Sequence, residues 1–312
     1  MDIAALKKEA KSKRTSSARL EELASIPDAA VQAVVAANPN TPHAVLETLA
    51  VHNRVIVLKA LAKNRNTPMH VLERLAGHPQ FSVRRVVARW AQISETHALE
   101  MLNDDDQQTR FLIVEHSRRF PWDRRALFER AANDAWWFVR QAVAQRCAIH
   151  AVLERLTKDE YEVVVAHALS NRALKLPTMT ARLEVELQRL TEADVFSFAN
   201  LTMTRRDLPA DWLEQYKHHP NSTVRLFVAI HPNTRKDTVL ELARDPDWGV
   251  QSATASLPNL PLEVYAGYAQ HPLFFVRRAL VNNEHVPREI LQSLVNDRDQ
   301  EIAKRARQRL ET

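Results

Sequence analysis

The strongest constraint in the sequence is a repeat of about 26 residues. Two distant segments share one phrase, HPQFSVRR at 78–85 and HPLFFVRR at 271–278. When the two phrases are aligned on their valine, other segments fall into the same frame. The frame residues are Val31, Val57, Val83, Thr109, Val139, Val165, Val195, Val224, Val250, Val276 and Ile302, with less regular spacing in the middle. About eleven units begin in this way, so the pattern predicts an array of small repeats.

Each clear unit predicts two short helices. In VLKALAKN (57–64) and VRLFVAIH (224–231), apolar residues at the first, fourth and fifth positions make one face at helical spacing. A second segment such as PHAVLETLA (42–50) has the same i, i+3, i+4 spacing. Prolines separate the helices because a proline ring does not fit inside a helix.

The predicted helix boundaries rest on a few polar residues and prolines. Asparagines are placed after the first helix, where this residue type tolerates the left-handed conformation: Asn38, Asn64 and Asn283. Thr41 and Thr67 are predicted to cap the second helix, with Pro42 and Pro68 in its first turn. Each unit then ends at a His-Pro or Asp-Pro step.

A unit of two such helices cannot bury its apolar face alone, whereas stacked neighbours bury it together. The predicted fold is therefore an all-α solenoid of ten to eleven two-helix repeats. We expect residues 1–24 to form a basic leader or cap and residues 25–310 to form a single solenoid. The repeats are regular at 30–90 and 219–310 and irregular at 100–215.

Composition narrows the possible functions. The chain has only three glycines, too few for a dinucleotide-binding loop, a P-loop or a nucleophile elbow. A single cysteine, Cys147, excludes an internal disulfide and an all-cysteine metal site within one chain. The sequence shows no apolar run of membrane-spanning length and no signal-peptide pattern, so we expect a cytoplasmic protein without a membrane partner. The formal charge of +5 permits nucleic acid or acidic protein as a partner.

With VRxxVAxN, NPxTP and LxxLAxDP recurring in register, the sequence resembles the leucine-rich repeat variant family. The resemblance implies a right-handed superhelix of alternating α- and 3₁₀-helices without strands. It is specific at 30–90 and 219–310 and loose between 100 and 215. One family member holds a 4Fe–4S centre on an N-terminal cysteine cluster that this chain lacks, so the resemblance implies no iron–sulfur cluster and no cofactor here. It also implies no common enzymatic activity.

Arginines recur directly after the frame residue, at Arg84, Arg110, Arg140, Arg225 and Arg277, with Arg85 and Arg278 one place further. Five residues before the frame residue lies a His or an Asp: His52, His78, Asp104, Asp134, His219, Asp245, His271 or Asp297. One interpretation is a structural ladder in which the arginine bonds the Asp or His and exposed carbonyls. The other is a row of guanidinium groups that meets phosphates or carboxylates.

Aromatic rings cluster in the turn before the first helix, at Phe81, Trp136, Trp137, Phe138, Trp248, Phe274 and Phe275. They are either staples that pack on the helix they precede or a surface that stacks bases or anchors a peptide. DAWWFVR (134–140) and PLFFVRR (272–278) place adjacent rings that cannot all face the core. The candidate binding residues are Arg84, Arg85, Trp136, Trp137, Arg140, Arg225, Trp248, Phe274, Phe275, Arg277 and Arg278.

Three other groups are candidates for metal binding or catalysis, and we expect neither from them. The identical HAVLE segments at 43–47 and 150–154 each place a His and a Glu one turn apart, but a metal needs three or four converging ligands, so we expect no metal site. The three aspartates at 104–106 are expected to form a solvated turn. Cys147 lies three residues before His150, and we expect a buried cysteine without catalytic activity.

Two functions from different classes remain open at this point. The first is a non-enzymatic scaffold that binds an unidentified protein or peptide along a curved surface of arginines and aromatic rings. The second is a nucleic-acid binder, including a glycosylase that removes alkylated bases in the manner of some HEAT-like proteins. That enzyme class places Trp and Asp over the lesion, and the neighbours Trp122-Asp123 and Asp247-Trp248 match no such motif here.

Overall fold

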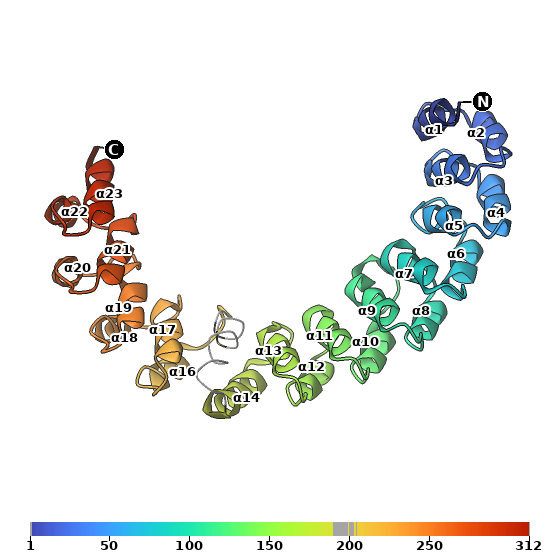
Figure 1. Ribbon diagram of the computed structural model, residues 1–312. Helices are drawn as coiled ribbons and strands as arrows, with labels where there is room; N and C mark the ends of the chain where they lie inside the picture. Colours follow the sequence, from blue (N-terminus) through green and yellow to red (C-terminus); the bar gives the residue numbers. More distant parts are fainter. Residues whose placement is uncertain (1, 190–198, 200–202, 204, 312) are drawn as a thin grey trace. The chain divides into compact units, whose positions relative to one another are not determined.

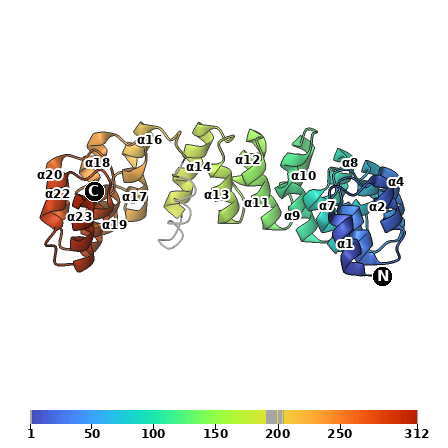
Figure 2. The same ribbon diagram turned by 90° about the horizontal axis from the view of Figure 1, so that it is seen from above.

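The computed structural model describes residues 2–189, 199, 203 and 205–311, and these residues form helices without any strand (Figure 1). The chain divides into two compact units, residues 1–164 and residues 165–312. In each unit a first helix and a second helix alternate along the chain. Figure 2 shows the same helices from above.

The first unit contains six helix pairs and the start of the next one. Its first helices are α1 (Ile3–Lys11), α3 (Ala29–Ala37), α5 (Val55–Leu61), α7 (Phe81–Trp90), α9 (Gln107–Glu115) and α11 (Trp137–Arg146). Its second helices are α2 (Ser17–Ala24), α4 (His43–Val51), α6 (Met69–Ala76), α8 (Glu95–Met101), α10 (Arg125–Ala131) and α12 (His150–Leu156). Helix α13 (Glu162–Ser170) spans the division between the units.

The second unit repeats this order. Its first helices are α17 (Ser222–Ile230), α19 (Trp248–Ala255), α21 (Phe274–Asn282) and α23 (Gln300–Glu311). Its second helices are α14 (Leu176–Arg189), α16 (Ala210–Gln215), α18 (Lys236–Leu242), α20 (Leu262–Ala269) and α22 (Arg288–Leu294). The second helix is thus α-helical in every described pair, and the 3₁₀ turn η1 (Ser117–Arg119) lies between α9 and α10.

Within each unit the helices form two layers (Figure 1). First helices pack closely on neighbouring first helices, as α3 does on α5 and α17 on α19, while second helices touch one another much less. The frame residues of the repeat point into this packed layer and are fully or almost fully buried: Val31, Val57, Val83, Val224, Val250, Val276 and Ile302. The all-α helical-repeat solenoid predicted from the 26-residue frame is therefore confirmed.

The asparagines after the first helices do not adopt the predicted left-handed conformation. Asn38 has φ −74° and Asn283 has φ −73°, both extended. Their side chains reach into the preceding repeat instead, where Asn38 Nδ2 donates to the carbonyls of Ala10 and Ser12 at 2.7 and 2.9 Å. A buried carbonyl without a partner is costly. The asparagine is therefore placed to satisfy the neighbouring helix end.

The predicted threonine caps are also wrong. Thr41 Oγ1 donates to the carbonyl of Val35 at 2.6 Å, and Thr67 Oγ1 donates to that of Leu61 at 2.7 Å, so both threonines close the helix before them. Pro42 precedes the second helix as its N-cap and does not lie in its first turn. The extended backbone that proline favours positions the chain for the second helix without a side-chain cap.

The segment 1–24, expected as a leader or cap, contains the helix pair α1 and α2, and α1 packs on α3 as later first helices pack on their neighbours. In the irregular middle, pairs α9/α10 and α11/α12 keep the same order. The turn η1 supplies the extra residues between Thr109 and Val139. No helix among the described residues has both the length and the apolar character that a membrane span requires.

Candidate functional site

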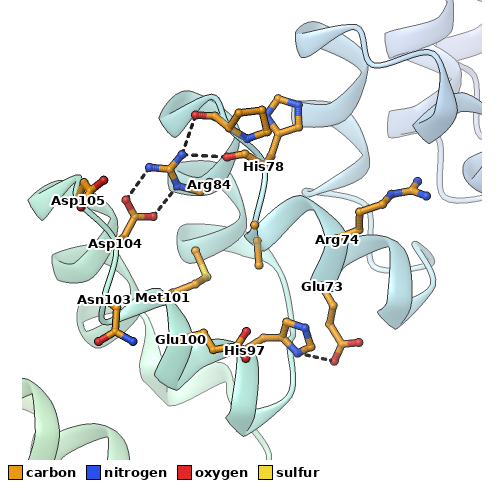
Figure 3. A pocket seen from close by; sticks show the side chains of 13 residues that line it. Glu73, Arg74, His78, Arg84, His97, Glu100, Met101, Asn103, Asp104 and Asp105 are labelled. Carbon is orange, nitrogen blue, oxygen red and sulfur yellow. Dashed lines mark hydrogen bonds and ion pairs between the residues drawn. The ribbon is translucent and has the colours of Figure 1, made fainter.

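The recurring arginines form a ladder inside the protein. Each one donates Nε and Nη2 to both carboxylate oxygens of an aspartate in the next repeat, and donates Nη1 to the carbonyl six residues before it. Arg84 bonds Asp104 at 2.6 Å through both nitrogens and the His78 carbonyl at 2.9 Å (Figure 3). The described pairs are Arg84–Asp104, Arg110–Asp134, Arg140–Asp159, Arg225–Asp245 and Arg277–Asp297. We call this set the arginine ladder.

The arginine ladder is buried, and its charges neutralise one another. The side chains of Arg277 and Asp297 are only 3% and 4% exposed. Burial alone would raise the pKa of Asp297, but the hydrogen bonds from Arg277 and the Asp299 N–H, together with the positive charges of Arg277 and Arg298, outweigh it, and the pKa is lowered. The hydrogen bond to Asp297 raises the pKa of Arg277. Four of the candidate binding residues, Arg84, Arg140, Arg225 and Arg277, therefore hold repeats together, and their guanidinium groups are already occupied.

The repeats that lack the arginine also lack the aspartate. Gln32, Leu58 and Gln251 stand at the arginine position, and the residues twenty places further are His52, His78 and His271. Gln251 Nε2 keeps the carbonyl bond of the ladder, to Asp245 at 2.6 Å. A buried carboxylate without its cation would be strongly unfavourable. This matched exchange within one chain is a sequence signal by which a structural ladder can be distinguished from a row of free guanidinium groups.

Histidine and aspartate perform the same local task at this position. The Oδ1 of Asp297 accepts from the backbone N–H of Asp299 at 2.8 Å, and the Nδ1 of His271 accepts from that of Leu273 at 3.1 Å. Both side chains thus fix the turn before the first helix. Only the aspartate adds the charge that the arginine needs.

Arg85 and Arg278 differ from the buried arginines. Arg85 pairs with Asp106 at 2.6 Å and lies over the Phe81 ring at 4.6 Å. Arg278 is exposed and lies 5.4 Å from the ring centroids of both Phe274 and Phe275. Among the described carboxylates, none lies within 4.0 Å of Arg278. Arg278 therefore remains a candidate for contact with another molecule.

Aromatic rings form one exposed cluster in each unit, at the N-terminal ends of first helices. In the first unit, Trp136 contacts Phe111 and Phe138 at centroid distances of 6.2 and 5.1 Å, and Trp137 stacks on Tyr161 at 5.7 Å. The cluster crosses three successive repeats. Trp136 and Trp137 are half-buried, while Phe138 and Tyr161 are 39% and 42% exposed.

In the second unit, Trp248 from α19 stacks on Phe275 from α21 at 5.0 Å, and Phe274 lies 4.0 Å from Phe275. Trp248 is 47% exposed, Phe274 37% and Phe275 39%. Rings packed as helix staples would be covered, so these are only partly staples. Sequence reasoning did not place Phe111 and Tyr161 in the candidate set, because the irregular spacing of the middle repeats hid their register.

The opposite ends of the first helices carry a second ladder. Asn64 Nδ2 donates to the carbonyls of Ala36 and Asn38, in the repeat before its own, at 2.7 and 2.9 Å. Asn38 and Asn283 each donate in the same way to carbonyls of the repeat before their own. Arg119, Arg205, His231 and Arg309 take the same place in other repeats. These polar side chains satisfy buried helix ends and are structural.

The turn at 104–106 is not the solvated turn that was expected, because Asp104 and Asp106 pair with Arg84 and Arg85 and are mostly covered. The other candidate groups are surface or core residues. His150 lies 3.8 Å from Glu154, and Glu47 pairs with His70 at 3.4 Å, one repeat away. No three His, Cys, Asp or Glu side chains converge on a metal position in the part of the chain that the structure describes. Cys147 is buried, and burial raises the pKa of its thiol. The thiol is therefore poorly suited to act as a nucleophile.

A cavity of about 470 Å³ opens beside the ladder pair Arg84–Asp104 (Figure 3). Glu73 and His97 pair at 3.3 Å in its wall. Arg84 pairs with Asp104 and His97 pairs with Glu73 among its lining residues (Figure 3).

Comparison with known proteins gives structural neighbours. No family model matches the chain, and no curated protein matches it. A solved structure described as a leucine-rich repeat variant with a novel repetitive structural motif is 18% identical, covers 84% of this chain and 88% of its own, and has a TM-score of 0.47. An engineered protein is 15% identical, covers 99% of this chain and 94% of its own, and has a TM-score of 0.36. The first neighbour bears the family name that the repeated motifs suggested.

Proposed function

We propose that the protein is a non-enzymatic repeat scaffold that binds extended protein segments, with one exposed aromatic cluster in each unit as the binding surface. The observation that carries the proposal is that rings from neighbouring repeats contact one another and yet stay exposed. Large aromatic side chains in such settings are typical anchors of protein interfaces. Exposed apolar rings otherwise cost solubility, so a partner that covers them explains their position.

The cluster of Trp248, Phe274 and Phe275 supports a segment with apolar and acidic side chains. Its rings offer apolar surface in two adjacent repeats, and Arg278 beside them offers an exposed positive charge. An extended segment crossing the repeats would contact rings of α19 and α21 in turn. An acidic side chain next to the apolar contacts would pair with Arg278.

The arginine row gives no support to nucleic-acid binding at these helix ends, because its guanidinium groups bond aspartates. The residues considered for a glycosylase also have structural roles. Trp122 stacks on Phe120 at 4.6 Å and donates Nε1 to the Ile93 carbonyl at 3.0 Å. Asp247 caps α19 by accepting from the N–H of Gly249 at 2.8 Å.

The proposal is tested with a displayed library of random peptides selected on the full chain. Individual selected peptides are then measured on a variant with Trp248→Ser, Phe274→Ser and Phe275→Ser. The control variant carries Val51→Ser, Met69→Ser and Leu262→Ser, which remove three exposed apolar side chains from second helices. Far-ultraviolet circular dichroism verifies that both variants keep their helices.

We expect the aromatic variant to bind selected peptides at least 100-fold more weakly, since two anchor residues of interface type account for about 2 kcal/mol or more each and tenfold corresponds to about 1.4 kcal/mol. The control variant should bind within twofold of the original chain. Equal binding by the aromatic variant, or the absence of any specific peptide, would contradict the proposal.

A further inference from the structure

A basic pocket lies in the first unit, at the C-terminal ends of its first helices. Its volume is about 490 Å³, and it opens between the loops that follow α5, α7 and α9. The charged side chains in its wall are Lys63, Arg65, Arg89 and Arg119, and no carboxylate lines it. The indole of Trp90 is also part of the wall. The aromatic clusters discussed above do not contribute to this pocket.

Arg119 lines the pocket and has a structural role. Its Nε donates to the carbonyl of Ala91 at 2.7 Å, Nη1 donates to that of His116 at 2.6 Å, and Nη2 donates to that of Ala88. Burial lowers the pKa of Arg119 to about 10, which still leaves the side chain charged at neutral pH. Arg119 therefore adds a fixed positive charge to the lining of the pocket.

The other three cations have no internal role. Lys63, Arg65 and Arg89 are exposed, and none of them makes an ion pair or a side-chain hydrogen bond with a described residue. Basic residues near helix C-termini often bond the last carbonyls. Asn64 and Arg119 already bond such carbonyls in these repeats. The three charges are therefore free to meet an anion.

The electrostatics of a neighbouring histidine agree with this placement. Burial lowers the pKa of His116, and the positive charges of Arg119, Arg89 and Arg146 lower it further against the opposing effect of Glu115. At His116 the effect of the nearby positive charges thus exceeds that of the carboxylate of Glu115. A bound polyanion would relieve the mutual repulsion of these groups.

Trp90 indicates which class of anionic ligand suits the pocket. Its side chain is 54% exposed, and the Arg89 guanidinium lies 5.5 Å from the ring centroid. An indole beside a group of cations suits a ligand that carries a flat ring next to a negative charge. A nucleobase stacks on aromatic rings, and its phosphate pairs with lysine and arginine. A segment of acidic side chains alone would use the cations and leave the ring uncovered.

We propose that this pocket binds a nucleotide, with the base on Trp90 and the phosphate on Lys63, Arg65 and Arg89. The nucleotide is either a free molecule or one unit of a single strand. Further exposed cations favour the strand: Lys13 and Arg14 in the corresponding loop after α1, and Arg118 beside Arg119 in η1. The inference goes beyond the proposed scaffold function, and its site shares no residue with the aromatic clusters.

The test measures fluorescence anisotropy of labelled twelve-nucleotide single strands of DNA and RNA on the full chain, at 50 and 200 mM salt. If about four phosphates are contacted, the slope of log K against log salt is near −3 for a single strand. AMP as a competitor distinguishes the two sources. Complete displacement at micromolar AMP indicates a site for the free nucleotide, and displacement only by unlabelled strands indicates the strand.

Variants locate the site. We expect Arg65→Gln with Arg89→Gln to weaken binding at least tenfold and to make the salt slope shallower by about 1.4. Trp90→Leu should weaken binding about fivefold or more without changing the slope, because stacking carries no charge. Lys236→Gln with Arg244→Gln removes two exposed charges from the second unit as a control and should leave binding within twofold.

Three results would overturn the inference. The first is no binding of any strand and no competition by AMP at 50 mM salt. The second is equal loss of affinity in the control variant. The third is competition by polyglutamate of equal charge as strong as that by unlabelled strands, which would identify an acidic protein segment as the occupant.

Discussion

The pair Arg277–Asp297 tests whether the arginine ladder is structural. Replacing Arg277 by glutamine leaves the Asp297 carboxylate, only 4% exposed, without its cation. Breaking a buried ion pair from one side costs about 3–5 kcal/mol, a large part of the stability of a typical domain. The Asp299 N–H still donates to Asp297, so part of the charge remains solvated and the lower end of that range is expected.

The chain itself supplies the compensating change. In the preceding repeat the corresponding residues are Gln251 and His271, which keep the carbonyl bond and the turn but carry no buried charge. The double variant Arg277→Gln, Asp297→His copies this arrangement. It should regain about 2 kcal/mol relative to Arg277→Gln alone, since residues in direct contact couple by up to about 3 kcal/mol.

Hydrogen exchange of the amides in α21 and α23 reports the local opening free energy, and urea unfolding followed by circular dichroism reports the whole chain. Local measurement matters because end repeats of an array open separately from the rest. A double variant that is no more stable than Arg277→Gln, within about 0.5 kcal/mol, would refute the view that the aspartate is retained only to meet the arginine.

Two further predictions concern pH and the second ladder. The pKa of Asp297 and that of Asp207 are lowered in the folded protein. Their contribution to stability is therefore present above the unfolded pKa of about 3.9 and is lost as the pH falls below it through the folded pKa values. The urea midpoint should accordingly drop between about pH 5 and pH 2. The double variant at Arg277 and Asp297 should show a shallower drop, and an unchanged profile would contradict this assignment. Asn64→Ala leaves two buried carbonyls without a donor and should cost about 1–3 kcal/mol in urea unfolding, while Asn66→Ala at the exposed neighbouring position should cost less than about 1 kcal/mol. Equal costs at the two positions would count against the second ladder.

The sequence predicted the fold because the core contacts repeat with the chain. Frame residues such as Val57 and Val276 recur every 26 residues, and each is fully buried against its neighbours. Apolar spacing at i, i+3 and i+4 then suffices to place both helices. Register was less certain at 100–215, where η1 lengthens one repeat, and Phe111 and Tyr161, which lie in this part of the chain, were overlooked.

The polar residues were harder to interpret because their partners lie one repeat away. Local propensity places Asn38 in a left-handed turn and makes Thr41 a cap, whereas in the structure Asn38 bonds Ala10 and Thr41 bonds Val35. The arginines looked equally suitable for phosphate or for aspartate. Only the joint presence of Arg277 with Asp297, and of Gln251 with His271, separates the two interpretations.

The arginine ladder also limits how such a chain can be shortened or extended in evolution, because the arginine of one repeat must meet an aspartate in the next. Removing residues 85–110 would place Arg84 opposite Asp134 and restore a complete pair across the new junction. Removing residues 252–277 would place Gln251 opposite Asp297 and leave the buried Asp297 carboxylate without a cation at the new junction. Lineages that gain or lose repeats are therefore expected to cut where the ends match, or to change both ends together.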